Sequence, residues 1–341
     1  MPGKNGSGSP GKLKLNELTR IIAGSRTSFH PQTLLGPKIG EDAAFLDLGN
    51  CILVAHVDPI TEAGKGSGRL AVIVASNDIA VSGARPKWAL ALFLLPPTGS
   101  IDEYYYLFEE VGDEARKLGL EIIGGHSERS PGLSKPVVAL SALGCACKEC
   151  IVPTGGARPG DLVIQIGSAA REGALILAED FRDLLVSAGV EESIIEGASK
   201  LIDTLSIVDL AVELAENGLV SSMHDATEGG LLGALVEASL ASNTLFKINK
   251  NKIIIDYIVS VIARALRLDP LKLISSGTLV ATAPPVKANE VMRIAEALGY
   301  KSGVIGIVEA SSKPGVVLVD NEHEYFIKEP PEDEISRFWK E

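Results

Sequence analysis

The sequence predicts an α+β protein that consists of two α/β domains. The chain has 341 residues, which is more than one domain core of ordinary size holds. Strand-like and helix-like apolar patterns alternate in both halves of the chain. Pro153 and the Gly155-Gly156 pair interrupt this alternation near the middle. The expected units are a flexible tail and N-terminal helix over residues 1–34, a first domain over 35–152, a second domain over 153–320 and a C-terminal extension over 321–341.

Apolar periodicity and helix-ending glycines define the elements of the first half. An apolar run over 69–82, closed by Gly83, predicts one long helix, and the segment 102–118, closed by Gly119, predicts another. The other expected elements are a short amphipathic helix over 13–23 and strands over 43–48, 51–57, 88–95, 120–123 and 136–147.

The second half begins again with a strand, over 162–166, after a turn that contains Pro159-Gly160. Residues 221–230 are expected to form a loop that leads into a helix. The other expected elements are helices over 171–187, 203–217, 230–242 and 287–298, a loop and strand within 269–283, and late strands over 303–309 and 315–319.

Charge and composition narrow the class of protein. The formal net charge is −12, from 32 basic and 44 acidic residues, which argues against nucleic acid as a partner. The longest apolar run, residues 88–95, is too short to cross a membrane. Residues 1–12 have no apolar core and are expected to be a flexible tail, not a signal peptide. We therefore expect a cytoplasmic, reduced protein with neither nucleic acid nor membrane as a partner.

Acidic residues in the first half follow strands or interrupt apolar runs. Asp42 follows Glu41 between a glycine and two alanines, Asp58 ends a strand, and Asn77-Asp78 lies inside an otherwise apolar helix. A charge buried without a partner is costly, so each of these acids is either on a solvated face or next to a partner. Carboxylate oxygens are the ligands that Mg²⁺ prefers. We expect Asp42, Asp58 and Asp78 to share a metal and phosphate site.

Two glycine-containing stretches are candidates for contacts with phosphate. In the first, Gly124 and Gly125 would let the backbone approach a ligand, and the adjacent His126 would either bind it or cap a loop. The second stretch precedes an apolar helix, whose bare N-terminal amides attract anions. An ordinary capped helix is the alternative there, with Thr227 as the cap. The candidate residues of the second stretch are Asp225, Thr227, Gly229 and Gly230.

Three of the four cysteines cluster in the sequence as Cys145, Cys147 and Cys150. A structural zinc site requires four ligands, and no histidine is close in sequence to these three cysteines. Small buried side chains on one face of a strand explain Cys145 and Cys147 without a metal. Metal binding or redox chemistry remains the alternative.

The order of seven short motifs resembles one family of ATP-binding proteins. The motifs are IGEDAAFLDL, HVDPITEAG, ASNDIAVSGARP, GGHSER, GARPGDLVI, HDATEGGLLGALVEAS and DPLKLISSGTLVA, and they extend over about residues 35–310. They resemble the aminoimidazole ribonucleotide synthetase (PurM-like) superfamily, and within it most closely the hydrogenase-maturation family HypE.

The resemblance implies two PurM-type domains, with the N-terminal domain forming a homodimer through its sheet and ATP with Mg²⁺ in a cleft. On the family pattern, Asp42, Asp58 and Asp78 fall on metal- and phosphate-binding acids, with Asn77 beside them. Gly124 and Gly125 fall on a loop at the nucleotide. Asp225, Thr227, Gly229 and Gly230 fall on a helix-start loop facing the same cleft.

Three departures from the pattern concern the activity. HypE proteins end in a cysteine-bearing tail, and this chain has no cysteine after Cys150. Glu128 stands near the place of a lysine, and Ser276 stands where an acid precedes the glycine.

The expected function is a HypE-like, Mg²⁺-dependent ATP enzyme. It would use phosphotransfer or dehydration to activate an oxygen or amide of a small molecule or a partner protein, with His126 or Asp225 as the acid/base. The alternatives are a non-catalytic nucleotide-binding dimeric scaffold and an enzyme similar to thiamine-monophosphate kinase.

Overall fold

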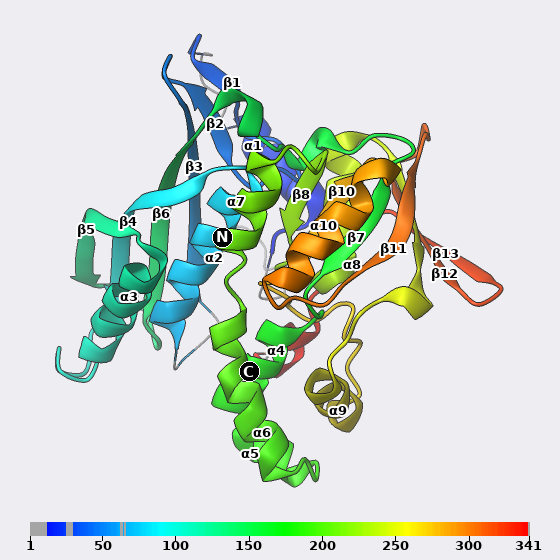
Figure 1. Ribbon diagram of the computed structural model, residues 1–341. Helices are drawn as coiled ribbons and strands as arrows, with labels where there is room; N and C mark the ends of the chain where they lie inside the picture. Colours follow the sequence, from blue (N-terminus) through cyan, green and yellow to red (C-terminus); the bar gives the residue numbers. More distant parts are fainter. Residues whose placement is uncertain (1–11, 25–29, 62–63, 65, 340–341) are drawn as a thin grey trace, which may run out of the picture.

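The computed structural model describes residues 12–24, 30–61, 64 and 66–339, and they form two α/β units (Figure 1). The tail expected over residues 1–12 lies outside the described residues except for Lys12. Each unit is built on one sheet, of six and of seven strands. The prediction of an α+β protein with two α/β domains is therefore confirmed.

The first unit contains a mixed sheet in the strand order β1-β2-β3-β6-β4-β5. Its strands are β1 Thr33–Leu35, β2 Ala44–Asp47, β3 Ile52–Ile60, β4 Arg85–Leu95, β5 Glu121–Arg129 and β6 Val137–Ala146. Helices α2 Ser67–Val81 and α3 Tyr105–Leu118 pack against one face of this sheet. The short helix α1 Leu15–Gly24 precedes the sheet.

The second unit contains a sheet in the order β13-β12-β9-β11-β7-β10-β8. Helices α7 Val208–Glu216 and α10 Pro285–Ala297 pack on one face, and α8 Gly230–Ser242 packs on the other. The strands are β7 Leu162–Ile166, β8 Ser222–Asp225, β9 Leu245–Asn249, β10 Leu279–Ala283, β11 Ser302–Glu309, β12 Gly315–Asp320 and β13 His323–Ile327. A separate helical cluster contains α4 Arg171–Asp180, α5 Arg182–Ser187, α6 Glu192–Ser199 and α9 Tyr257–Leu266.

Helix α2 belongs to both units and lies at the centre of the molecule (Figure 1). Its residues Leu70 and Ile73 pack with the α4 cluster, and Ala80 and Val81 pack with α7. A helix that contacts protein on all sides needs apolar residues on all sides, which explains why its sequence shows no polar face. Two of its polar residues, Asn77 and Asp78, have partners outside the helix, whereas the buried Ser76 hydroxyl has none among the described residues.

The structure differs from the predicted elements in several places. Strand β5 continues through Gly124 and Gly125 to Arg129, where a strand end was expected. The expected loop at 221–230 contains strand β8, and the helix expected over 171–187 is divided into α4 and α5. Strand β13 lies within the predicted extension and pairs with β12. Elements β9, α6 and α9 were not predicted.

None of the helices among the described residues has the length and apolar character needed to span a bilayer.

Candidate functional site

A group of three metal-ligating side chains lies between strand β3 and helix α2. His56 and Asp58 are two residues apart on β3, so they point to the same face of the sheet, toward α2. Asp78 projects from α2 to meet them. One ligand atom from each of the three residues lies within 4.8 Å of the others. Among the described residues no other group of three such side chains is this close.

The His56 imidazole lies between two acidic residues. Its Nδ1 contacts the backbone oxygen of Asp42, and its Nε2 lies 2.9 Å from Asp78 Oδ2. That second contact lacks the angle of a hydrogen bond, so Nε2 is a buried nitrogen without a hydrogen-bond partner. Burial is the largest single influence and lowers the pKa of His56, but Asp78, Asp58 and the Asp42 backbone together outweigh it and raise this pKa to about 9.

The acids of this region lie close enough to repel one another. Burial, followed by the charges of Glu228 and Asp78, raises the pKa of Asp58 to about 7. Burial also raises the pKa of Asp42, although the neighbouring His224 opposes this. A bound divalent cation would offset the cost of burying these carboxylates and would reduce their mutual repulsion, because it brings positive charge next to them.

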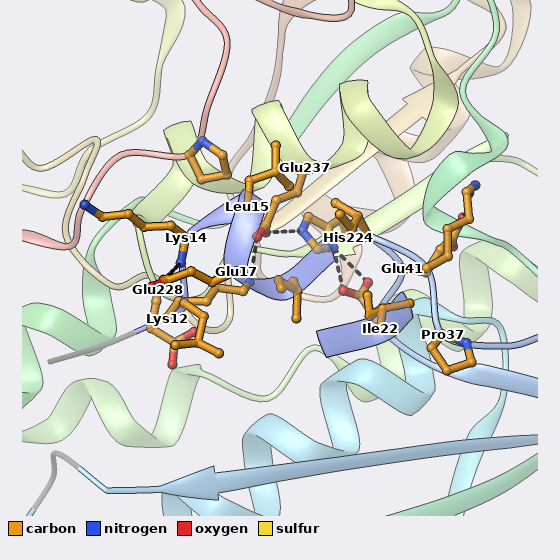
Figure 2. A pocket seen from close by; sticks show the side chains of 18 of the residues that line it. Lys12, Lys14, Leu15, Glu17, Ile22, Pro37, Glu41, His224, Glu228 and Glu237 are labelled. Atoms are coloured by element: carbon orange, nitrogen blue, oxygen red, sulfur yellow. Dashed lines mark hydrogen bonds and ion pairs between the residues drawn. The ribbon is translucent and has the colours of Figure 1, made fainter. Parts of the chain in front are cut away.

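Asp42 belongs to a chain of charged groups that also includes His224, Glu237 and Lys12, which Figure 2 labels. His224 Nδ1 lies 2.7 Å from Asp42 Oδ1, and Thr154 Oγ1 donates to Asp42 Oδ2 at 3.0 Å. On the other side of the ring, His224 Nε2 lies 3.1 Å from Glu237 Oε2, and Lys12 Nζ lies 2.6 Å from Glu237 Oε1. Burial lowers the pKa of His224, but Asp42 and Glu237 together raise it to about 10.

The structure therefore unites only part of the predicted metal set. Asp58 and Asp78 lie together with His56, whereas the Asp42 side chain is paired with His224. Glu41 turns away from this cluster and accepts hydrogen bonds from the backbone of Thr154 and Gly155 at 3.0 and 3.1 Å.

Asn77 and Asp225 join the two units beside the cluster. Asn77 Nδ2 donates to Asp225 Oδ2 and to the Leu205 backbone oxygen, both at 3.0 Å, and the Ile207 amide donates back to Asn77. The Gly277 amide donates to Asp225 Oδ1 at 3.0 Å. Burial, followed by the charge of Asp78, raises the pKa of Asp225 well above its ordinary value.

A groove of about 840 Å³ is lined by Asp42, His56 and His224. Helix α1, residues 36–44, the start of α8 and residues 329–333 form its walls. Acidic side chains such as Asp42 and Glu228 line it together with Lys12, Lys14 and Lys38. Figure 2 shows the two lysines of the N-terminal segment and Glu228 on the same side of His224. The groove thus offers acids for a cation and ammonium groups for phosphate oxygens.

The N-terminus of α8 is filled by the chain itself. The Gly229 amide donates to Asp333 Oδ2 at 2.7 Å, and Asp333 Oδ1 accepts from the amides of Ile274 and Ile335. The cap residue is Gly229, with φ of 80°, so the prediction of Thr227 as the cap is wrong. The Thr227 backbone oxygen instead accepts from Gly230 at 3.0 Å.

The geometry of the two glycines has a structural cause. A Cβ at Gly230 would lie 2.7 Å from the Leu271 and Leu273 backbone oxygens, and its φ of 66° favours glycine. The predicted contact of Gly229 and Gly230 with phosphate competes with the Asp333 carboxylate, which already accepts a hydrogen bond from the Gly229 amide.

The predicted residues Gly124, Gly125 and His126 lie on the exposed edge strand β5, not on a loop. The ladder aligns Gly125 with Ala91, Leu140 and Asp58 across three strand spacings, about 14 Å. A Cβ at Gly125 would lie 1.9 Å from the Ala91 backbone oxygen, which explains this glycine. The exposed His126 is paired with Glu128 at 3.1 Å. Within one chain, these three residues are not part of the acidic cluster.

Several residues of the site were missed in the sequence. His56 could have been found, because it shares a strand face with Asp58. His224 directly precedes the candidate Asp225 and could also have been considered. No local signal marks Glu237 or Thr154, because their contacts come from distant elements.

The fold and this cleft define a class of two-domain α/β proteins with an acidic cluster at the junction of the domains. Residues 40–146 match the family described as AIR synthase related protein, N-terminal domain, and residues 158–319 match its C-terminal domain. The chain belongs to the AIR synthase related family, and the predicted PurM-like resemblance is confirmed.

Named relatives fall in the same family. The carbamoyl dehydratase HypE of Rhizobium leguminosarum is 26% identical over 272 residues, covering 77% of this chain and 74% of that protein. The selenide, water dikinase of Myxococcus xanthus is 24% identical over 345 residues, covering 92% and 95%. A crystal structure of the hydrogenase maturation protein HypE in complex with ATP superposes with a TM-score of 0.71 at 21% identity, covering 95% of this chain and 94% of that chain. These named relatives are enzymes, and their similarity extends over both domains.

Proposed function

We propose that this chain is a Mg²⁺-dependent, ATP-binding enzyme similar to HypE. It would use phosphotransfer or dehydration to activate an oxygen or amide of a small molecule or of a partner protein. The cluster of His56, Asp58 and Asp78, of which His56 lines the groove, carries this proposal. The ATP complex of a HypE protein with the same fold supports it.

The residues present fit a Mg²⁺ ion bound with nucleotide phosphates. Asp58 and Asp78 offer the hard oxygen ligands that the ion prefers, and two protein carboxylates are typical for it. The raised pKa of Asp58, caused by burial and by the charges of Glu228 and Asp78, indicates a site that added positive charge would stabilise. Bound Mg²⁺ would neutralise phosphate charge during the transfer of a phosphoryl group.

The remaining residues would position the ligands. Lys12, Lys14 and Lys38 line the groove where a polyphosphate would need ammonium groups. His224 holds Asp42 beside the cluster, and Asn77 holds Asp225. Asp225 is our candidate acid/base, because burial and the charge of Asp78 raise its pKa and so favour its protonated form.

A homodimer through the first sheet would give the residues of β5 a role. Gly124, Gly125 and His126 lie too far from Asp58 to act on the same cleft within one chain. They are on an exposed strand beside the uncovered sheet face, so in our proposal they serve the cleft of a second copy. His126 remains the second candidate acid/base under this arrangement.

The proposal predicts that Asp78→Asn abolishes stabilisation by Mg²⁺ and ATP. A ligand present at 100 times its Kd stabilises a fold by about 2.7 kcal/mol, so the wild type should show a clear upward shift in Tm. The measurement is thermal unfolding with ATP in the presence of Mg²⁺ and in EDTA. The matched control is Asp113→Asn on the exposed face of α3, which should keep the full shift. An equal shift in Asp78→Asn and the wild type would overturn the proposal.

A non-catalytic scaffold of the same fold is the second candidate. The carboxylate of Asp333 at the start of α8 favours it, because it fills a place where phosphate could bind. ATP turnover with a panel of small acceptors and carbamoyl compounds distinguishes the two candidates. Binding of Mg-ATP without turnover under any of these conditions would support the scaffold.

A further inference from the structure

All four cysteines of the chain lie at one end of strands β3 and β6. Cys51 immediately precedes β3, Cys145 is the penultimate residue of β6, and Cys147 and Cys150 follow β6 directly. This end of the sheet is separate from His56 and Asp58, which lie further along β3. Neither the predicted buried pair nor the ATP site accounts for this arrangement.

The strand register places Cys51 opposite Cys147. Strands β3 and β6 are antiparallel, with Ile52 paired to Ala146 and Leu53 paired to Cys145. The next position outward therefore sets Cys51 against Cys147, and Cys145 lies diagonally from Cys51. The Cys51 and Cys145 sulfur atoms are 2.8 Å apart, which is about 0.8 Å longer than a disulfide bond.

The structure contains one disulfide, between Cys147 and Cys150. The expectation of a small, buried cysteine is wrong for Cys147, which is exposed, whereas Cys51 and Cys145 are partly buried free thiols. An ion pair of 2.8 Å between Lys148 and Asp47 holds the disulfide turn against β2. Two thiols in contact thus lie beside a disulfide that the same chain supplies.

We propose that these cysteines form an internal dithiol–disulfide exchange site. The Cys51 thiolate attacks Cys147 Sγ, forms a Cys51–Cys147 bond and releases the Cys150 thiolate. The Cys145 thiolate then attacks Cys51 Sγ, forms a Cys51–Cys145 disulfide and releases the Cys147 thiolate. One disulfide breaks and one forms, and two protons pass from Cys51 and Cys145 to Cys147 and Cys150. The exchange needs no outside oxidant.

The surroundings indicate which thiol attacks first. Burial and the neighbouring Cys51 raise the pKa of the Cys145 thiol, which disfavours its thiolate as the first attacking group. Only Cys51 faces Cys147 across the strands, so it is also the thiol in register for the first attack. Cys145 is in contact with Cys51 and is placed for the second step.

A thiolate metal site explains these cysteines less well. Among the described residues, no group of three or more cysteine, histidine or acidic ligands at this end of the sheet lies within 4.8 Å of one another. The exchange needs only pairwise contacts, which the structure provides.

The test is disulfide mapping on the full-length wild type. The chain is reduced, freed of reductant, oxidised without oxygen by one equivalent of diamide, left to equilibrate, quenched in acid and alkylated in denaturant. Mass spectrometry of the unreduced digest should show a Cys51–Cys145 link in some molecules, with Cys147 and Cys150 alkylated. Fewer than about one such molecule in a hundred would overturn the proposal. This ratio corresponds to a difference of about 59 mV between the reduction potentials of the two disulfides, each a two-electron couple.

Two variants test the individual steps. The double variant Cys145→Ser, Cys150→Ser keeps only Cys51 and Cys147, so it should trap the mixed disulfide within one chain. The variant Cys51→Ser should show the Cys147–Cys150 link alone. Failure of the double variant to form an intramolecular link, while circular dichroism matches the wild type, would also overturn the proposal. The outcome is independent of ATP binding, because no cysteine lines the groove.

Discussion

At the scale of single residues, buried carboxylates distinguish this protein. Glu172 on α4 is only 2% exposed, and its Oε2 accepts from the Ser276 amide at 3.1 Å. The family pattern has an acid where this chain has Ser276. The carboxylate of Glu172 reaches this place from a different element. Burial is the largest cause that raises the pKa of Glu172 to about 8, and the charges of Glu228 and Asp333 act in the same direction.

This pKa predicts a pH dependence of stability that Glu172→Gln should remove. Between the ordinary value of 4.5 and about 8, the folded state holds a proton that the unfolded state has lost. Stability therefore falls as pH rises, by about 1.4 kcal/mol per pH unit. From pH 5.5 to 7.5, the wild type should lose about 3 kcal/mol more than Glu172→Gln.

Urea denaturation in EDTA at the two pH values measures this difference. Glu196→Gln, on the exposed face of α6, serves as the control and should follow the wild type. Parallel pH profiles for the wild type and Glu172→Gln would show that Glu172 does not hold the extra proton.

Residue patterns predicted some of the site because they reflect burial. Asp78 stood out as a charge within an apolar helix, and the structure gives it a partner in His56. Asn77 stood out for the same reason and bonds across to Asp225. The chain from Asp42 through His224 to Glu237 and Lys12 could not be predicted, because its members are up to 225 residues apart in sequence.

At the scale of elements, local signals predicted the helices that have clear ends. Helix α8 was predicted at 230–242, as observed, because two glycines precede an apolar run. Strand β8 was read as a loop, since its His224 and Asp225 are polar. Both side chains are buried there because each has a charged or polar partner. Strand β5 was cut short because an exposed edge strand needs no apolar alternation.

Helix α8 and the C-terminal segment depend on each other through Asp333. Its carboxylate accepts from the amides of Gly229, Ile274 and Ile335, so it connects three segments. Replacing Asp333 by alanine leaves these buried amides unpaired, and we expect a loss of about 1–3 kcal/mol in the free energy of unfolding. Chemical denaturation at pH 8 measures it.

The control for this prediction is Asp113→Ala, an exposed acid on α3. It should change stability by less than about 0.5 kcal/mol. An Asp333→Ala variant as stable as this control would show that Asp333 does not hold the three segments together.

At the scale of the whole molecule, one face of the first sheet is left uncovered by the part of the chain that the structure describes. Val57, Leu90 and Ile123 are 62%, 44% and 50% exposed on it. The register sets Val57 and Leu90 on either side of Ser141, so two apolar side chains flank one small polar side chain across three strands. Grouped apolar side chains of this kind are typical of a surface that another protein covers.

We predict that Leu90→Glu converts a dimer to a monomer. A charge at position 90 would lose its water on association without gaining a partner. Size-exclusion chromatography with light scattering measures the mass. Val286→Glu on α10, at a position that is 90% exposed, is the control and should leave the dimer intact. A monomeric wild type, or a dimeric Leu90→Glu, would rule out this face as the dimer interface.

Helix α2 supplies packing side chains to both halves of the molecule. A hinge motion between the halves would have to break the apolar contacts of α2 with one of them. A wide opening would therefore be costly. A ligand must then enter the groove past those wall segments that are packed least tightly. These are α1, which has no buried residue, and residues 329–332, which precede the buried Asp333. A ligand of the groove would then enter by displacing these two segments, while the body stays closed.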